Sequence, residues 1–585
     1  MKTKKIFITF SFLLFANCFL STISFAQSPN WLWAKSAGMN NYGSGIGFLP
    51  NKSDEAHSVT VDASGNSYVA GSFSSDSITF GSITLINSSG SGWNSGTMFI
   101  VKYDVAGNIL WAKSAVGASD ATALTTDASG NIYVAGNYRG TSVTFGSITL
   151  NNVINYYSDI FLVKYDASGN VLWAKSAGGD SDDLATSVTV DASGNACVAG
   201  YFGSSSITFN SITLNNIVNI AGNNYDIFIA KYDTNGNLLW AKNAGGSSND
   251  EASSVTADIS GNVYVTGSFV SSSITFGSTT LINTSSGAYN SDMFIAKYDA
   301  SGNVIWAKST GGDSNQEGAS ITADASGNVY ATGIFYSLAI TFGSTTLYNI
   351  IQSSFGSSSD MFVVKYDASG NVLWAKSAGG NNLDGSASLT ADASGNIYIA
   401  GYSYSPSVTF GSINLNNAGS VNMFIVKYDA GGNALWAKST GENGEAAAAA
   451  DASGNVYMAG YFNNPTITFG SITLNNTDTT GSTVDMFIAK LASTNTEIEN
   501  IENIAGINIF PNPSNGKFGI EMNNQQLAAD LMNLEIYNSL GEKIYQVAIQ
   551  TPESTIDISN QPSGIYFLNI KTEKESFSQK LIIQK

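Results

Sequence analysis

The chain has 585 residues but only one histidine, one arginine, two cysteines and eight prolines. His57 alone cannot supply a histidine triad or a cluster of histidine metal ligands. A single arginine, Arg139, disfavours an anion clamp built from several arginines. Cys18 lies in the apolar N-terminal segment and leaves Cys197 as the one cysteine of a processed chain. An internal disulfide is therefore excluded, and Cys197 is expected to fill a core.

Charged residues are also scarce, at 12% of the chain, and the net charge is −19. An acidic surface repels nucleic acid phosphates, so nucleic acid is not an expected partner. The 43% of apolar residues and the many aromatics exclude a disordered chain. Val, Ile, Thr, Tyr and Phe alternate with Gly, Asn, Ser and Asp, which is typical of short strands and turns.

Residues 1–26 have the features of a secretory signal peptide. Lys2, Lys4 and Lys5 precede an apolar stretch, and Ala26 ends a cleavage site of small residues. A membrane anchor and lipidation at Cys18 are the alternatives. Cleavage would make the charge of the secreted chain −22, with no transmembrane segment left.

Three sequence elements then recur seven times, mostly 59 to 68 residues apart. A repeat of this kind indicates an array of identical supersecondary units. Trp-Ala-Lys begins at Trp33, Trp111, Trp173, Trp240, Trp306, Trp374 and Trp436. Asp-x-Ser-Gly-Asn begins at Asp62, Asp127, Asp191, Asp258, Asp324, Asp392 and Asp451. An apolar-Phe-apolar-apolar-Lys pattern surrounds Phe99, Phe161, Phe228, Phe294, Phe362, Phe424 and Phe487.

Each repeat predicts four antiparallel strands, here named A to D. In the third copy they are 187–190, 196–202, 227–232 and 238–242, with tight Asp-to-Asn turns between A and B and between C and D. The last copy lacks strand D, whereas residues 30–35 form a spare one. We therefore predict an all-β fold over 27–491: a seven-bladed β-propeller closed by its N-terminal strand. An open solenoid is the alternative.

The repeat units resemble the bacterial seven-bladed β-propeller repeat family over residues 30–491. The resemblance rests on the Trp-Ala, Asp-Ala-Ser-Gly-Asn-Val-Tyr-Val-Ala-Gly and Phe-Val-Lys-Tyr patterns. It implies the fold, but members of the family share no common chemistry.

The B–C and D–A connections share one face and hold nearly all the variation in length, so a ligand is expected there. Each B–C connection contains a hairpin such as 78–85, whose apolar side either packs on a blade or forms a docking collar. Beyond the hairpins, aromatic side chains either bind a sugar or protein partner or cover their own hairpins. They are Trp93, Tyr156, Tyr157, Tyr225, Tyr289 and Phe355.

The D–A connections carry acids seven or eight residues before the turn aspartate. They are Asp54, Glu55, Asp120, Asp183, Asp250, Glu251, Glu317 and Asp384, with Glu445 one residue out of register. At the mouth of a central channel these carboxylates could hold Ca²⁺ or a cationic group. Alternatively, each caps the amides of its own loop. No other cofactor is indicated.

A polar linker, 492–506, leads to a compact unit of short strands, 507–585, expected to be a small β-sandwich. It resembles the C-terminal sorting domain of type IX secretion cargo, known from the Bacteroidota. The matching residues include Pro511, Asn512, Pro513, Gly516, Gly541, Gly564, Tyr566 and Lys580. The resemblance implies recognition by the secretion machinery, export through the outer membrane, and release or attachment at the cell surface.

These features favour a secreted or surface-attached binding scaffold whose ligand is a polysaccharide or a protein. A structural component of the cell surface or of a gliding apparatus is an alternative. A carbohydrate-active enzyme is a third, because two carboxylates of the acidic set suffice for glycoside hydrolysis. No catalytic residue is assigned, since nothing distinguishes one pair among similar positions.

Overall fold

The structure, a computed structural model, describes residues 29–39, 52–90, 96–218, 224–285, 287, 289–350, 358–417, 421–440, 446–478, 483–493, 507–522, 532–538, 542–549, 553–571 and 576–585. Every regular element in these ranges is a β-strand, and they contain no helix long and apolar enough to cross a bilayer. Contacts divide the chain into two units, Met1–Thr494 and Asn495–Lys585, which are described separately.

The first unit contains seven four-stranded antiparallel sheets, each with the strand order A-B-C-D. The first sheet has β2 (Asp54–Val61), β3 (Ser67–Phe73), β6 (Thr97–Tyr103) and β7 (Ile109–Ser114). The second has β8 (Ser119–Thr126), β9 (Ile132–Tyr138), β12 (Asp159–Tyr165) and β13 (Val171–Ala177). The third has β14 (Asp183–Val190), β15 (Ala196–Phe202), β18 (Asp226–Tyr232) and β19 (Leu238–Ala244). The fourth has β20 (Asp250–Ala257), β21 (Val263–Phe269), β24 (Asp292–Tyr298) and β25 (Val304–Thr310).

The remaining sheets repeat this arrangement. The fifth has β26 (Gln316–Ala323), β27 (Val329–Phe335), β30 (Asp360–Tyr366) and β31 (Val372–Ala378). The sixth has β32 (Asp384–Ala391), β33 (Ile397–Ser403), β36 (Asn422–Tyr428) and β37 (Ala434–Ser439). The seventh has β38 (Ala446–Ala450), β39 (Val456–Phe462), β42 (Asp485–Leu491) and, as its strand D, β1 (Trp31–Ala37). The expected pairing of the N-terminal strand with the last repeat is thus observed, for example between Trp33 and Lys490.

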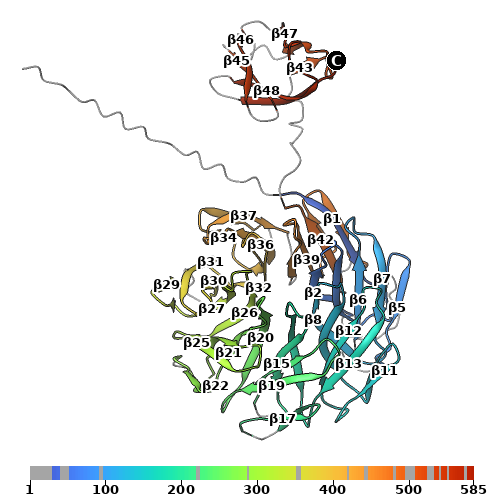
Figure 1. Ribbon diagram of the computed structural model, residues 1–585, viewed down its shortest axis with the longest axis vertical. Helices are drawn as coiled ribbons and strands as arrows, with labels where there is room; N and C mark the ends of the chain where they lie inside the picture. The colour runs from blue at the N-terminus through green and yellow to red at the C-terminus, as the bar shows by residue number, and fades with distance from the viewer. Residues whose placement is uncertain are drawn as a thin grey trace, which may run out of the picture. The chain divides into compact units, whose positions relative to one another are not determined.

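Successive sheets follow one another around a common centre, with the A strands innermost (Figure 1). Each A strand contacts the A strand of the next sheet, and β38 contacts β2. Strands B and C are buried on both faces, for example Tyr68 to Ala70 and Met98 to Val101. The apolar core therefore lies between neighbouring sheets, as the clusters that combine residues of two or three sheets show.

The recurring turn aspartates stabilise the A–B and C–D turns through local hydrogen bonds. Asp62 accepts hydrogen bonds from the backbone N–H groups of Ser64 and Asn66, both at 2.9 Å, and from Asn66 Nδ2 at 2.9 Å. Gly65 has φ of +79°, a conformation that a residue with a side chain rarely adopts. The Asp-x-x-Gly-Asn pattern therefore acts as a turn motif.

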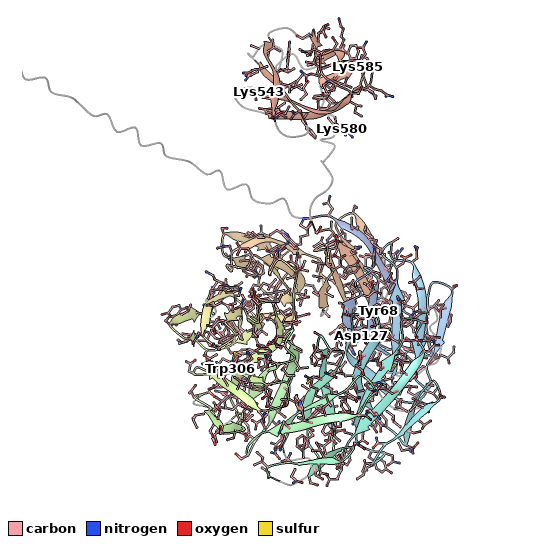
Figure 2. All side chains as sticks on the ribbon, in the orientation of Figure 1. Tyr68, Asp127, Trp306, Lys543, Lys580 and Lys585 are labelled. Carbon is pink, nitrogen blue, oxygen red and sulfur yellow. The ribbon has the colours of Figure 1, made fainter. Side chains whose placement is uncertain are left out.

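Repeated polar contacts also link each sheet to the turns of the next (Figure 2 labels Tyr68 and Trp306, two of the recurring aromatics). Six of the seven strand D tryptophans donate to a carbonyl in the next C–D turn, as Trp240 Nε1 does to Ala300 O at 3.1 Å. The same contacts join the seventh sheet to the first. Trp33 Nε1 donates to Val105 O at 3.1 Å, and Tyr457 Oη donates to Gly65 O at 3.1 Å.

The insertion of each repeat forms a small hairpin in the B–C connection. The seven hairpins are β4 (Ser77–Phe80) with β5 (Ile83–Ile86), β10 (Ser142–Phe145) with β11 (Ile148–Asn151), β16 (Ser206–Phe209) with β17 (Ile212–Asn215), β22 (Ser273–Phe276) with β23 (Thr279–Ile282), β28 (Ala339–Phe342) with β29 (Thr345–Tyr348), β34 (Ser407–Phe410) with β35 (Ile413–Asn416), and β40 (Thr466–Phe469) with β41 (Ile472–Asn475). Ile78 and Phe80 are buried, and the Phe80 ring lies 5.2 Å from that of Phe99. The apolar side of the hairpins therefore packs on a sheet, and the alternative of an apolar docking collar is wrong for it.

The second unit consists of two antiparallel sheets. One contains β43 (Ile507–Phe510), β44 (Lys517–Met522) and β47 (Glu553–Asp557). The other contains β45 (Met532–Asn538), β46 (Lys543–Ile549), β48 (Gly564–Lys571) and β49 (Ser576–Ile583). One core joins them, with Phe518 and Ile556 from the first sheet and Leu534 and Leu568 from the second.

Candidate functional site

The acids of the D–A connections occupy two different registers rather than one ring. Asp54, Asp183, Asp250 and Asp384 begin strand A and are at most 1% exposed. Glu55, Asp120, Glu251 and Glu317 stand one residue further on and are partly exposed. Adjacent residues of a strand point to opposite sides. The expectation that all of these carboxylates ring a channel mouth is therefore wrong for the four aspartates.

Each of the four buried aspartates is bonded to a serine that follows strand B of the same sheet. Asp183 Oδ2 accepts from Ser204 Oγ at 2.8 Å, and Asp183 Oδ1 accepts from Ser204 N at 3.2 Å. Asp54, Asp250 and Asp384 bond Ser75, Ser271 and Ser405 in the same way, with O···O distances of 2.8, 2.7 and 2.7 Å. These carboxyl groups thus cap loop amides and hydroxyls, which was the alternative interpretation of the acidic set.

A second aspartate, from the start of strand C in the preceding sheet, interacts electrostatically with each of these groups. The pairs are Asp54 with Asp485, Asp183 with Asp159, Asp250 with Asp226, and Asp384 with Asp360. Burial raises the pKa of Asp183 to about 8 and that of Asp159 to about 6. An added Cβ at Gly178 would lie 1.9 Å from Asp159 Oδ1, which explains the glycine there. No sequence signal separated these second aspartates from ordinary strand residues.

The partly exposed acids have individual environments. His57 Nδ1 lies 3.0 Å from Asp120 Oδ1, and His57 Nε2 lies 3.2 Å from Glu55 Oε2. Although burial alone would lower it, the two carboxylates raise the pKa of His57 to about 10. The imidazole is therefore protonated at neutral pH. Its ion pair with Asp120 connects strand A of the first sheet to strand A of the second.

Glu251 and Glu317 lie in two adjacent sheets. Burial raises the pKa of both, and the charge of Glu317 adds to the effect on Glu251. Glu445 is outside the described residues. Within those residues no group of three or more His, Cys, Asp or Glu side chains is arranged to hold a metal ion.

The aromatic candidates differ in exposure. Tyr289 and Tyr156 are 88% and 79% exposed, and Tyr157 is 38% exposed. Tyr225 instead packs edge to face on Tyr201, with ring centroids 5.1 Å apart. Trp93 and Phe355 are outside the described residues. Tyr156 and Tyr289 are therefore the predicted aromatics that are most available to a partner.

Two further exposed tyrosines were not predicted. Tyr348 at the end of β29 is 69% exposed, and Tyr404 after β33 is 46% exposed. Tyr348 is the last residue of its hairpin, and Tyr404 is the first residue after a strand B. A search of these two repeat positions for aromatic residues would have found both.

Cavities lined by described residues of the first unit include two of similar size. One, of about 360 Å³, is lined mainly by Ala, Ser and Thr side chains of the seven A strands, with His57 and Tyr461. The other, of about 310 Å³, lies between the first three sheets, and its lining includes Asp120, Asn137, Arg139 and Leu184. Cys197 lines neither cavity: it is buried, and burial raises the pKa of its thiol to about 12.

The motif residues of the second unit fix the C-terminal strand. Asn512 Nδ2 donates to Lys580 O at 2.7 Å, and Asn512 Oδ1 accepts from Ile582 N at 2.9 Å. Tyr566 Oη donates to Pro562 O at 2.9 Å, whereas the Lys580 side chain is exposed (Figure 2). Gly516 has φ of +100° and lies against Ser559. Gly541 is outside the described residues.

Comparison with known families agrees with both units. Residues 508–584 match the model of the secretion system C-terminal sorting domain. Residues 45–76 and 239–268 match the model of the β-propeller repeat. The chain therefore carries a secretion system C-terminal sorting domain and two segments that match the β-propeller repeat. As type IX secretion cargo it is exported to the cell surface or the extracellular space, and its sorting domain implies interaction with the secretion machinery.

Curated relatives are longer. A WD repeat-containing protein of Acanthamoeba polyphaga mimivirus is 26% identical over 63% of this chain and 26% of its own length. The regulatory protein FlaEY of Caulobacter vibrioides is 28% identical over 24% of this chain and 15% of its own. The chain thus spans about a quarter or less of these relatives.

Similar solved structures include the extracellular domain of a one-component system from B. thetaiotaomicron. It has a TM-score of 0.20 and 11% identity, covering 91% of this chain and 80% of that one. A Synechocystis apocarotenoid oxygenase has a TM-score of 0.31 and 10% identity, covering 80% and 95%.

Proposed function

We propose that the first unit is a seven-bladed β-propeller closed by β1, and that it serves as a non-catalytic binding scaffold outside the cell. The ligand binds on the face formed by the B–C and D–A connections. Support for the closed ring comes from contacts of the seventh sheet with the first, of which three carry the argument. These are the side-chain bonds of Trp33 and Tyr457 and the contact of β38 with β2.

A difference between the two faces carries the assignment of the binding face. On the turn face, the Asp-to-Asn turns are nearly identical, and their carbonyl groups accept bonds from neighbouring sheets, as Ala300 O does from Trp240. On the opposite face, the loops vary in length and sequence and expose Tyr156 and Tyr289. Exposed tyrosines provide large contact area at low entropic cost, and variable loops allow specificity without disturbing the sheets.

A binding screen tests this function. The purified full-length protein is applied to arrays of polysaccharides and extracellular matrix proteins, and hits are compared with the variants Tyr156→Ser and Tyr289→Ser. We expect one or both variants to lower affinity about 10-fold, because truncating an aromatic anchor commonly costs more than 1 kcal/mol. Ile259→Ala is the matched control. Ile259 is 71% exposed in an A–B turn, and alanine is the residue of other repeats at this position.

Binding that is lost in Ile259→Ala and kept in both tyrosine variants would contradict the choice of face. Self-association without any ligand would favour a structural role at the cell surface. Release of products from a bound glycan, abolished by mutation of one carboxylate, would establish an enzyme instead.

A further inference from the structure

The only arginine and the only histidine of the chain lie in the same sector of the first unit. His57 belongs to the first sheet and bonds Asp120 of the second, and Arg139 follows β9 of that second sheet. The positions equivalent to Arg139 in the other sheets carry no charge: Ser74, Gly203, Val270, Tyr336, Tyr404 and Asn463. Repeat symmetry is therefore broken here, around the cavity of about 310 Å³.

Three polar side chains line one side of this cavity. Asp120 pairs with Asn137 across β8 and β9, and Arg139 stands two residues beyond Asn137, so all three point to the same side of the sheet. Asp120 and Arg139 are diagonal neighbours, about 7 to 8 Å apart at their Cα atoms. A hexuronic acid carries a carboxylate and several hydroxyl groups on one ring, so it can offer an acceptor to Arg139 and donors to Asp120.

The guanidinium of Arg139 is held in place but accessible. Arg139 Nη2 lies 3.0 Å from Asp182 Oδ1, and the side chain remains 58% exposed. Asp182 Oδ1 also accepts from Ser158 N at 2.8 Å, which fixes this carboxylate. An arginine has five N–H donors in a planar fork, which suits a second, planar carboxylate.

Leu184 also lines the cavity, and four of the other sheets have Glu or Asp at the equivalent position: Glu55, Asp120, Glu251 and Glu317. The loss of one acid beside Arg139 reduces repulsion of an anionic ligand. The side chain also offers an apolar surface for the C–H face of a sugar ring. The loop with Tyr156 and Tyr157 lies next to this site, since Gly140 N donates to Asn155 O at 3.3 Å.

We propose that this cavity binds a hexuronic acid unit of a glycan. The sugar carboxylate pairs with Arg139, its hydroxyls bond Asp120 and Asn137, and its ring lies against Leu184. Tyr156 and Tyr157 contact the neighbouring sugar. The inference rests on the proposed binding function and names the ligand class and the sector of the face that binds it.

Calorimetry on the full-length protein tests the proposal. The probes are oligosaccharides that contain glucuronate, galacturonate or mannuronate, and their carboxyl-reduced, neutral counterparts. We expect at least one uronate probe to bind, and its neutral counterpart to bind about 10- to 100-fold more weakly, as expected for loss of a charge-assisted hydrogen-bonded pair. Succinate and glycine are tested as carboxylates without a sugar ring.

Four variants locate the site. Arg139→Ser and Leu184→Glu are each expected to lower uronate affinity about 10- to 100-fold, whereas Arg139→Lys retains part of it. Leu184→Glu installs the residue that other repeats carry, so the fold should tolerate it. Lys52→Ser is the matched control, because it also removes one cation from the same face. Lys52 lies in a D–A connection and pairs with Asp76. This variant should leave uronate affinity unchanged.

The proposal is overturned if Arg139→Ser binds uronates like the parent protein, if reduced and acidic probes bind equally, or if glycine or succinate binds as tightly. Failure of every uronate probe, together with array hits that require Tyr289, would refute this site and keep the proposed function. Failure of all ligands on the arrays would refute both.

Discussion

The buried aspartate pairs should make the stability of the first unit fall as pH rises, and Asp183→Asn tests this. Asp183 is fully buried, and its pKa is raised by burial from 3.8 to about 8. At pH values between these limits the native state binds a proton that the unfolded state has released. Stability conferred by the neutral acid is therefore complete below about pH 4 and is lost as pH rises towards 8.

The size of the effect follows from the same shift. A rise of about 4 pKa units corresponds to roughly 5 kcal/mol between the ionised and neutral states, which is an upper limit for one substitution. Asparagine is close in shape and remains neutral. Ser204 Oγ lies 3.2 Å from Ser181 O, so its hydrogen can turn there and its oxygen can accept from the new amide. We expect Asp183→Asn to add about 2 to 4 kcal/mol at pH 8 and about a third of that gain at pH 5, where the unfolded-state carboxyl is already ionised.

Urea denaturation at pH 5 and pH 8 measures this difference. Asp233→Asn is the control of opposite sign. Asp233 lies in a C–D turn, where its bonds to Asn237 lower its pKa, so this substitution should cost stability at pH 8 and less at low pH. If Asp183→Asn destabilises the protein at pH 8 as much as at pH 5, Asp183 is ionised and the reasoning fails.

Three further predictions concern closure, metal binding and export. Tyr457→Phe should lower the free energy of unfolding, measured by urea denaturation, by about 1 kcal/mol, because it removes one hydroxyl bond to the turn of the next sheet. Tyr133→Phe removes the equivalent bond between the second and third sheets and should cost the same. If Tyr133→Phe is destabilising and Tyr457→Phe is not, the ring is not closed. Millimolar Ca²⁺ should leave the melting temperature unchanged, because the four buried aspartates already bond serines. A rise of several degrees would support calcium binding by the acidic residues. Deletion of residues 507–585 should trap the first unit in the periplasm, and normal surface display of the truncated protein would refute the sorting role. Asn512→Ala should reduce export more than Asn515→Ala. The Asn512 side chain makes two bonds to β49, whereas the Asn515 side chain makes one local bond.

Much of the fold could be predicted because the repeat carries its own local chemistry. Asp62, Gly65 and Asn66 specify a turn by bonds within five residues, and the alternation around Phe99 specifies a buried strand. The pairing of β1 with β42 was also predictable, since counting strands left one without a partner at each end of the array. Such features depend on neighbours in sequence or on a count.

The candidate site was less predictable. Every A strand of the first six sheets contains a β-bulge, for example between Ala56 and Ser58. A bulge adds a residue on one strand, so counting back from the turn aspartate no longer tells which side a side chain faces. The sequence therefore indicates that Asp54 and Glu55 face opposite sides, but not which of the two is buried.

The role of Arg139 could not be predicted from the sequence either. As an isolated arginine it indicated only that a multi-arginine clamp is absent. Its role in the proposed site depends on Asp120 and Leu184, which line the same cavity, and on Asp182, which pairs with its guanidinium. By itself the sequence determined the repeat, its turns and the pairing of its N-terminal strand with the last repeat, because these follow from local hydrogen bonding, periodicity and the count of strands. Only the tertiary structure decided which acids are buried and which side chains share a cavity, because both depend on contacts between neighbouring sheets.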